Sequence, residues 1–311
     1  MEKTLLVVAG PTASGKTPSG IELARHYRTE IISADSRQIY RETSIGTAVP
    51  TREELAAVPH HFIQTISLRD SYNASIFEHQ VLKKLQELFT RHDLVLMVGG
   101  SGLYIEAVCG GIDDLPSADP LLRKALHDRI EKEGLGSLTD QLRILDPRSF
   151  QRLDLNNPMR VMKALEVTLQ TGRPYSSFLS ETAKNRPFRI VRVALDLKRE
   201  ALYERINARV DRMMERGLLD EVKQLQEFRG YTAMKTVGYR ELFRHLDGEL
   251  SLAEAVDLIK RNTRKFARKQ ITWFRKENRY QWIETGASEG NAVGECAEAV
   301  ISFVEKERSH P

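Results

Sequence analysis

A glycine-rich segment near the N-terminus constrains the fold of this chain more than any other feature. The P-loop pattern G-x-x-x-x-G-K-T is spelled by Gly10, Pro11, Thr12, Ala13, Ser14, Gly15, Lys16 and Thr17. The apolar run at residues 4–9 predicts a strand directly before it, and residues 17–27 have the apolar spacing of a helix. Strand, loop and helix in this order predict an α/β fold with a P-loop NTPase-like parallel sheet.

The P-loop pattern is typical of nucleotide- and ATP-binding proteins, and each part of it has a chemical role. The glycines let backbone N–H groups turn toward phosphate oxygens, and the next helix presents its positive end. Lys16 adds a point charge, and the hydroxyl of Thr17 is a ligand for Mg²⁺. We therefore predict that residues 10–17 bind phosphates, that Lys16 and Thr17 are catalytic, and that Mg²⁺ is the cofactor.

Composition excludes several other classes of protein. The chain has 311 residues and two cysteines, Cys109 and Cys296, and no histidine lies at zinc-ligand spacing from them. No apolar run approaches the roughly 18 residues of a membrane span, and the N-terminus lacks the basic segment of a signal peptide. We expect a cytoplasmic protein that binds neither zinc nor membranes.

Strand-like and helical segments alternate along most of the chain. Strands are expected at residues 30–34, 94–98, 189–195 and 280–283 besides the first, and the helices between them at 75–91, 101–109, 199–215, 218–228, 235–246 and 252–277. This βαβ rhythm is interrupted by a mainly helical block. We predict a core domain in two parts, residues 1–113 and 189–311, with helices flanking the sheet, and a helical insertion domain at 114–188.

A carboxylate follows the second strand. P-loop nucleotidases usually place a metal-organising acid after another apolar strand, but the run at 94–98 ends in Gly99, Gly100 and Ser101 instead. Asp35 follows the strand at 30–34, and parallel topology brings such strand ends to the P-loop edge. Its side chain has either a structural role, in an Asx turn or as a helix cap, or a chemical role, as a general base or a magnesium ligand.

Basic residues gather near the C-terminus. The net charge is +4, yet residues 251–280 contain nine Lys or Arg against three acids. On a helix at 252–277 most of them share one face, opposite Ile259, Phe266, Ala267, Trp273 and Phe274, which we expect to dock on the core. We predict nucleic-acid contacts from Arg264, Lys265, Arg268 and Lys269, although a solvated helix face also explains such a run.

Several motifs occur together in one order along the chain. They are GPTASGKT at 10, DSRQIY at 35, GTAVPT at 46, HHFI at 60, GGSGLYI at 99, PSADP at 116, NPMRVMKALEV at 157, VGYRE at 237 and RKFARKQITWFRK at 264. With this combination the chain resembles the bacterial tRNA dimethylallyltransferases, from the P-loop to about residue 280.

The resemblance implies an activity. It is the transfer of a dimethylallyl group from dimethylallyl diphosphate to N6 of the adenosine on the 3′ side of the anticodon, in tRNAs that read codons beginning with U. Asp35 then serves as the catalytic base, and Arg240 binds the diphosphate. Implied tRNA contacts are Asp35, Ser36, Arg37, Gln38, Ser101, Arg123, Met159, Arg160, Val161, Met162 and Lys163. We expect a monomer whose partners are tRNA and dimethylallyl diphosphate.

Two other functions remain compatible with the residues. A P-loop small-molecule kinase would use Arg205 and Arg209 as a lid. Such a kinase has no need of the basic helix, and the acid that it would place after a strand is missing after Val98. A noncatalytic RNA-binding protein would have no use for the intact pair Lys16 and Thr17.

Overall fold

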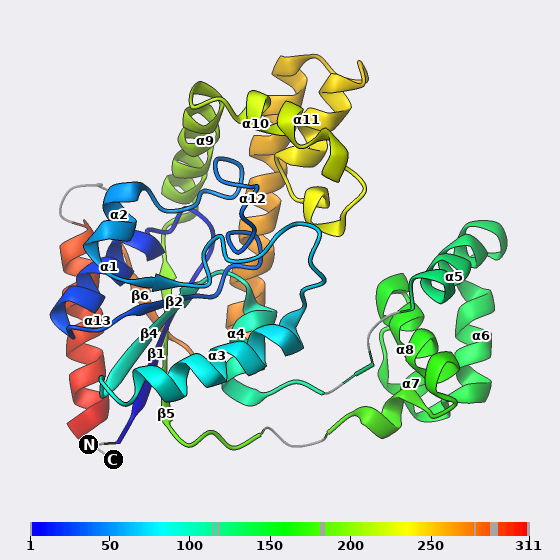
Figure 1. Cartoon of the computed structure of the whole chain (residues 1–311), viewed down its shortest axis with the longest axis horizontal. Helices are drawn as coiled ribbons and strands as arrows, with labels where there is room; N and C mark the ends of the chain where they lie inside the picture. The colour runs from blue at the N-terminus through cyan, green and yellow to red at the C-terminus, as the bar shows by residue number, and fades with distance from the viewer. Residues whose placement is uncertain are drawn as a thin grey trace. The chain divides into compact units, whose positions relative to one another are not determined.

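The chain divides into two compact units in the computed structural model. They are Met1–Gly110 with Asn185–Pro311, and Gly111–Lys184 (Figure 1). The structure describes residues 2–113, 115–116, 119–180, 184–276, 278–286 and 292–309. Asp114, where the insertion was predicted to begin, and Ser117 and Ala118 of the PSADP motif lie outside the described residues. The second unit begins and ends a few residues before the predicted insertion at 114–188.

One parallel sheet forms the centre of the larger unit. Its strands are β1 (Thr4–Ala9), β2 (Ile31–Ser33), β3 (His60–His61), β4 (Leu94–Gly99), β5 (Arg189–Asp196) and β6 (Gln281–Glu284). The strand order is β3-β2-β4-β1-β5-β6, and every pairing is parallel. The sheet confirms the predicted α/β fold. The sequence did not predict the two-residue strand β3.

Helices cover both faces of this sheet (Figure 1). In the larger unit they are α1 (Lys16–His26), α2 (Arg52–Ala57), α3 (Ala74–Leu88), α4 (Gly102–Gly110), α9 (Arg199–Glu215), α10 (Leu218–Gln224), α11 (Tyr239–Leu246), α12 (Leu252–Lys276) and α13 (Ala292–Ser309), with short 3-10 helices at Gln226–Phe228 and Thr232–Lys235. Every residue of β1 and β4 is buried, as expected for strands with helices on both sides. Among the described residues, no helix is both long and apolar enough to cross a membrane.

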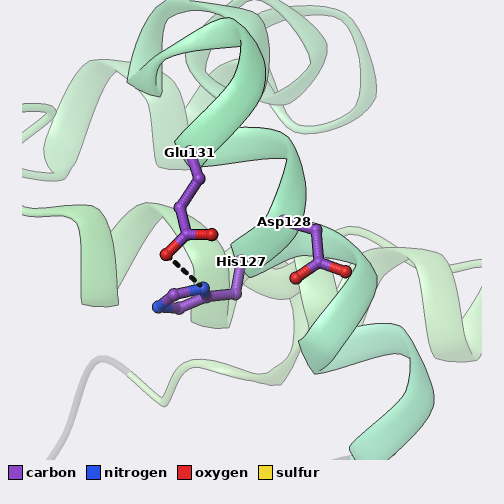
Figure 2. A group of neighbouring side chains, drawn as sticks. All are labelled: His127, Asp128 and Glu131. Atoms are coloured by element: carbon purple, nitrogen blue, oxygen red, sulfur yellow. Dashed lines mark ion pairs between the residues drawn. The ribbon is translucent and has the colours of Figure 1, made fainter.

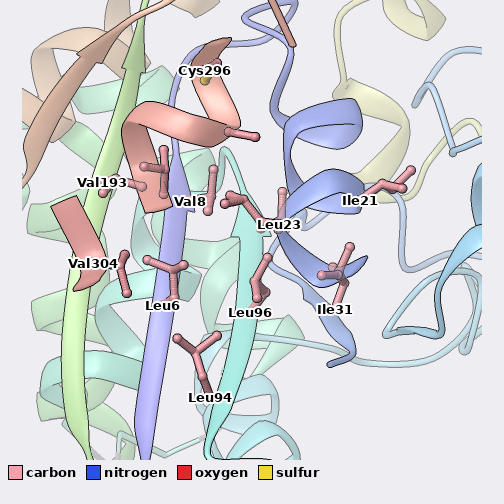
Figure 3. Packing of buried hydrophobic residues seen from close by; sticks show 14 of the residues in the cluster. Leu6, Val8, Ile21, Leu23, Ile31, Leu94, Leu96, Val193, Cys296 and Val304 are labelled. Carbon is pink, nitrogen blue, oxygen red and sulfur yellow. The ribbon is translucent and has the colours of Figure 1, made fainter. Parts of the chain in front are cut away.

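One of the two sheet faces packs against helices from both ends of the chain. Figure 3 shows Leu6 and Leu96 of the central strands beside Leu23 of α1 and Val304 of α13, and all four side chains are fully buried. Because α1 begins directly at the P-loop, this apolar packing holds the loop on the rigid edge of the sheet.

The register of the strands brings their carboxyl ends together. Ala9 at the end of β1 pairs with Gly99 of β4, and Ser33 of β2 pairs with Val98. The P-loop, the segment that starts at Asp35 and the turn at Gly100 therefore leave the sheet at one edge. This is the edge where open α/β sheets bind ligands.

The long helix α12 contradicts one part of the sequence interpretation. Its buried residues include Ile259, Ala267 and Phe274, as predicted, but Phe266 is 47% exposed and Trp273 is 43% exposed. The prediction that these two aromatic residues dock on the core is wrong. Gln270 is buried in their place, because it bonds to two backbone groups of the core.

The second unit is a small helical bundle. It contains α5 (Pro120–Glu133), α6 (Leu135–Leu145), α7 (Pro147–Arg152) and α8 (Pro158–Thr171), followed by a 3-10 helix at Tyr175–Phe178. Leu126 of α5, Leu142 of α6 and Leu165 of α8 share one buried cluster, so the unit has an apolar core of its own.

Candidate active site

A large cavity opens at the carboxyl edge of the sheet, with a volume of about 840 Å³. Its walls come from the P-loop, the segment after β2, the loop at residues 45–51, the turn after β4, and the helices α9 and α12. The residues used below are Thr12, Ser14, Lys16, Thr17, Asp35, Ser36, Arg37, Gln38, Ser101, Arg205, Arg209, Arg212, Arg216, Phe266 and Gln270. The cavity is within the usual size range of ligand sites.

The P-loop backbone is shaped for an anion. Ala13 and Gly15 have φ angles of 64° and 92°, in the left-handed region, and such residues turn consecutive N–H groups toward one point. Gly15 caps α1 without a side-chain hydrogen bond, whereas Asn73 caps α3 with its side chain. The first N–H groups of α1 thus remain available to a ligand. The buried Ser14 hydroxyl also has no partner among the described residues.

Lys16 lines the cavity with the rest of the P-loop from Thr12 to Thr17. Its Nζ donates a hydrogen bond to the carbonyl oxygen of Pro11, 2.6 Å away, so the ammonium group is held against the loop. Burial lowers the pKa of Lys16 to about 7; the Asp35 carboxylate opposes this effect and the Arg209 guanidinium adds to it. A bound phosphate would add negative charge beside this partly buried amine and so favour its protonated form.

Asp35 faces the same cavity, and both interpretations of its side chain fit the structure. Its Oδ1 accepts hydrogen bonds from the backbone N–H groups of Arg37 at 2.8 Å and Gln38 at 3.4 Å, which makes an Asx turn. The turn fixes the carboxylate beside the P-loop, where Asp35 influences both Lys16 and Arg209. The structural role therefore positions the group for a chemical one.

The residues after Asp35 are held by a compact network. The hydroxyl of Ser101 accepts a bond from the Ser36 N–H at 2.9 Å and donates one to the Ser36 hydroxyl at 3.1 Å. The side-chain NH₂ of Gln38 donates to the carbonyl oxygens of Thr47 and Ala48, at 3.3 and 2.8 Å. Ser36, Gln38 and Ser101 thus line one wall of the cavity, as predicted contacts with a common substrate require.

A row of arginines on α9 and at its C-terminal end forms another wall, which the sequence interpretation did not assign to a diphosphate site. The row is Arg205, Arg209 and Arg212 of α9, and Arg216 directly after it. Arg209 Nη1 donates to the Thr12 hydroxyl at 3.1 Å, and burial lowers its pKa while Asp35 opposes that shift. The spacing of the row, which puts its members on one face of a helix, was the available signal.

Gln270 of α12 is a second residue that the sequence did not indicate. Its Oε1 accepts from the Thr12 N–H at 2.8 Å, and its Nε2 donates to the Gly100 carbonyl at 2.9 Å. One side chain therefore joins the P-loop to the turn after β4. No sequence pattern distinguishes it, because the pairs are 258 and 170 residues apart.

Some predicted residues lie away from the cavity. Arg240 is not among its lining residues; its side chain is 52% exposed and pairs with Glu241 at 2.6 Å. The glutamate also caps the start of α11, which holds the arginine there. Gly10 and Pro11, the first two residues of the P-loop, are buried and do not line the cavity.

The basic side chains that were predicted as contacts on α12 differ in their exposure. Lys265, Arg268 and Lys269 are exposed. Arg264 is half-buried, and its Nη1 donates to the Asn207 side chain of α9 at 2.6 Å. The first three therefore present charge to solvent, whereas Arg264 also joins two helices.

The predicted tRNA contacts in the second unit also differ in their exposure. Arg123 Nε and Nη2 donate to Glu166 Oε2 at 3.1 and 2.8 Å, and that carboxylate is fully buried while the arginine is 43% exposed. The side chains of Val161 and Met162 are buried in the bundle core, where they are unavailable to a ligand. Exposed positions on the same helix are Met159 and Arg160, and Lys163 is half-buried with its pKa lowered by burial.

One group of side chains has the composition of a metal site. His127, Asp128 and Glu131 lie within one turn or so of α5 (Figure 2). Asp128 forms an ion pair with Lys124 at 2.7 Å, and the His127 and Glu131 side chains are 61% and 67% exposed. These are the properties of an exposed, salt-bridged helix face, so the group carries no metal assignment.

The fold and the cavity together define a class of protein. A P-loop after the first strand of a parallel sheet, an uncapped helix and cations that face one cavity are the features of P-loop proteins that bind polyphosphates. A family model described as IPP transferase matches residues 38–277. The chain belongs to this family.

Similar proteins have consistent names. The tRNA dimethylallyltransferase 1 of Phocaeicola vulgatus is 49% identical over 283 residues, which cover 91% of this chain and 94% of that protein. The crystal structure of the Bacillus halodurans tRNA isopentenylpyrophosphate transferase covers 99% of both chains, with 35% identity and a TM-score of 0.69. A eukaryotic dimethylallyltransferase acting on tRNA, at 24% identity, is alike in fold, with a TM-score of 0.77 over 98% of this chain and 80% of that one.

The comparisons confirm three predictions from the sequence. The chain is an IPP transferase family member, it has a P-loop-like α/β fold, and it is a transferase. Nothing in them favours the small-molecule kinase.

Proposed function

We propose that this protein transfers a dimethylallyl group from dimethylallyl diphosphate to N6 of the adenosine on the 3′ side of the anticodon, in tRNAs that read codons beginning with U. The observation that carries the proposal is that the P-loop and the Asp35 carboxylate face one cavity. A diphosphate leaving group and an amine nucleophile need these two kinds of group side by side. The relatives' names, which include tRNA dimethylallyltransferase, support the same reaction.

The chain's own cations stabilise the leaving group. As the allylic C–O bond breaks, its electron pair goes to the diphosphate, so negative charge grows on those oxygens. The N–H groups at the start of α1, the Lys16 ammonium and the Arg209 guanidinium face that position. Because Lys16 and Arg209 are partly buried, their attraction for the leaving group is stronger than in water.

Mg²⁺ is part of this proposal, and the residues present fit it. The Thr17 hydroxyl is a hard oxygen donor that lines the same cavity. Mg²⁺ keeps several waters and takes one or two protein ligands together with phosphate oxygens, so one protein donor is compatible with such a site. When bound, the ion would neutralise charge on the diphosphate.

Asp35 acts on the nucleophile. The N6 lone pair of adenine is delocalised into the ring, so the amine gains from an acceptor that orients it and takes a proton as the C–N bond forms. Oδ1 of Asp35 is engaged in the turn, which leaves Oδ2 to face the amine. Ser36, Arg37, Gln38 and Ser101 surround this position and contact the target nucleotide and its neighbours in the proposal.

RNA is the proposed partner because the target base lies in an anticodon loop. Enzymes that modify such bases extrude them from the stack, and the chain's exposed cations bind the phosphates. Lys265, Arg268 and Lys269 are exposed on α12, and Arg160 is exposed on the second unit, where Arg123 is half-buried.

The test is a transfer assay with purified protein, labelled dimethylallyl diphosphate, Mg²⁺ and an anticodon stem-loop, with ATP omitted. We expect label on the RNA, and none with Lys16→Ala or with a stem-loop that has guanosine at the target position. Absence of label with the wild-type protein and the adenosine stem-loop would overturn the proposal. Phosphorylation of a metabolite from ATP would reinstate the kinase.

A further inference from the structure

Two large aromatic side chains of α12 are partly exposed. Phe266, which lines the cavity, is 47% exposed, and Trp273 is 43% exposed. A tryptophan on a helix that packs against a core is usually turned inward, since its ring buries a large apolar area. Here the inward positions are taken by smaller or polar residues, including Ala267 and Gln270. The exposed aromatic rings therefore indicate a binding surface.

The place of Trp273 is set by a glycine. A Cβ atom added at Gly102 would overlap Nε1 and Cδ1 of the indole, so the ring lies directly on the backbone of Gly102. Gly100 and Ser101, immediately before this glycine, line the cavity, whereas Gly102 and Trp273 do not. The indole thus lies just outside the rim, two residues along the chain from the cavity wall formed by Gly100.

Charge indicates what covers this ring. Phe266, Lys269, Trp273 and Lys276 have spacings of three, four and three residues, which place them along one side of α12. Lys269 and Lys276 are exposed on either side of the indole, and residues 258–276 contain no acid. An apolar protein surface has no need of these cations. A single-stranded nucleic acid matches both features, because its bases stack on aromatic rings and its phosphates attract lysines.

We propose that Trp273 is a stacking platform for a nucleobase next to the one that enters the cavity. This inference rests on the proposed function and adds a binding position outside the cavity. A base extruded from the loop loses its stacking partner, and so does its neighbour in the strand. The indole replaces that partner, while Lys269 and Lys276 hold the adjoining phosphates. Gly102 is required because any larger residue would displace the ring.

The first test uses the chain's own fluorescence. The chain has two tryptophans, so Trp282→Phe leaves Trp273 as the reporter, and Trp273→Phe leaves Trp282 as the matched control. Titration with the anticodon stem-loop should quench the first variant and shield it from acrylamide, with little change in the second. An unchanged Trp273 signal at saturating RNA would overturn the proposal. A signal that depends on protein concentration without RNA would assign the face to a second copy, which would also overturn it.

The second test is kinetic and has a conservative control. Trp273→Ala should raise the KM for the stem-loop about tenfold, within the effect of losing one stacked base. The turnover of bound RNA and the KM for dimethylallyl diphosphate should change little. Trp273→Phe should restore most of the affinity, and Gly102→Ala should weaken it by displacing an intact indole.

Failure of this inference can be separated from failure of the proposed function. If the wild-type protein transfers the label and Trp273→Ala has the same KM, the stacking position is wrong and the reaction stands. If no variant transfers label, the reaction is wrong, and quenching of Trp273 by the stem-loop still decides whether the ring stacks on RNA.

Discussion

The cavity and the outer side of α12 both carry many cations, but they present them differently. Lys16 and Arg209 are partly buried, each is hydrogen-bonded to the P-loop, and burial lowers the pKa of both. Lys265 and Lys269 stand in solvent. The buried cations form a preorganised site for one anion of fixed shape, whereas the exposed ones attract any polyanion over a longer range.

Buried and exposed cations allow one chain to separate the chemical step from the capture of its substrate. Fixed, desolvated charges act strongly on charge that develops at one atom, and salt screens them little. Solvated charges bind phosphates by releasing counterions, so their effect is spread over many contacts and falls with salt. Mutations in the two regions should therefore change different steps of the reaction.

The largest effect should come from Asp35. Asp35→Asn keeps an oxygen that can accept the Asx-turn bonds but removes the base, so the transfer rate should fall about 10²- to 10⁴-fold. RNA affinity, measured by filter binding, should remain within about twofold of the wild-type value. If Asp35→Asn transfers at the wild-type rate, the base assignment is wrong. If it loses RNA affinity instead, the cavity and the outer side of α12 do not act on separate steps.

Arg209 should rank second. Arg209→Ala removes a guanidinium beside Thr12, and the loss of one such preorganised donor should slow transfer about 10²- to 10³-fold. Single-turnover assays at varied dimethylallyl diphosphate should show the loss, while the stem-loop Kd stays constant. Arg209→Lys is the charge-matched control and should recover part of the rate. A variant that alters only the stem-loop Kd would place Arg209 with the RNA-binding cations.

Gln270 links the two regions and should have an intermediate effect. Gln270→Ala leaves the Thr12 N–H and the Gly100 carbonyl without their partner, which should lower the free energy of unfolding by about 1–3 kcal/mol. Urea denaturation measures that cost, and the KM for dimethylallyl diphosphate should rise because the P-loop loses a support. Gln270→Glu keeps an acceptor for the Thr12 N–H but sets a buried carboxylate oxygen against the Gly100 carbonyl, so it should also be less stable than the wild-type protein. Equal stability of all three proteins would contradict the clamp.

The smallest effect should come from the outer side of α12. Lys269→Glu should weaken stem-loop binding a few-fold at about 0.1 M salt and reduce the slope of log K against log salt by about 0.7 per lost phosphate contact. Lys83→Glu, an equal charge change at an exposed position of α3, is the control and should leave both values nearly unchanged. The KM for dimethylallyl diphosphate should respond little in either variant. A salt slope that is the same in all proteins would remove α12 from the RNA interface.

Local patterns in the sequence determined much of the fold and part of the site. The P-loop pattern predicts the loop, whose backbone is left-handed at Ala13 and Gly15. The continuous apolar runs predict β1 and β4 as strands that are buried on both faces. Asp35 could be found because the carboxyl ends of parallel strands in one sheet meet at one edge, a consequence of topology alone.

The residues from distant segments that join this edge are known only from the three-dimensional packing. Arg209 reaches Thr12 across 197 positions and Gln270 reaches it across 258, and no local periodicity encodes such contacts. The same reason explains the errors at Trp273 and Phe266. Helical spacing ranks faces by average polarity, but Gln270, with two backbone partners, occupies a buried position of α12 and leaves Phe266 and Trp273 only partly buried. The hydrogen bonds of Gln270 to the edge of the sheet outweighed the amphipathic pattern of α12. Only the three-dimensional structure shows these bonds.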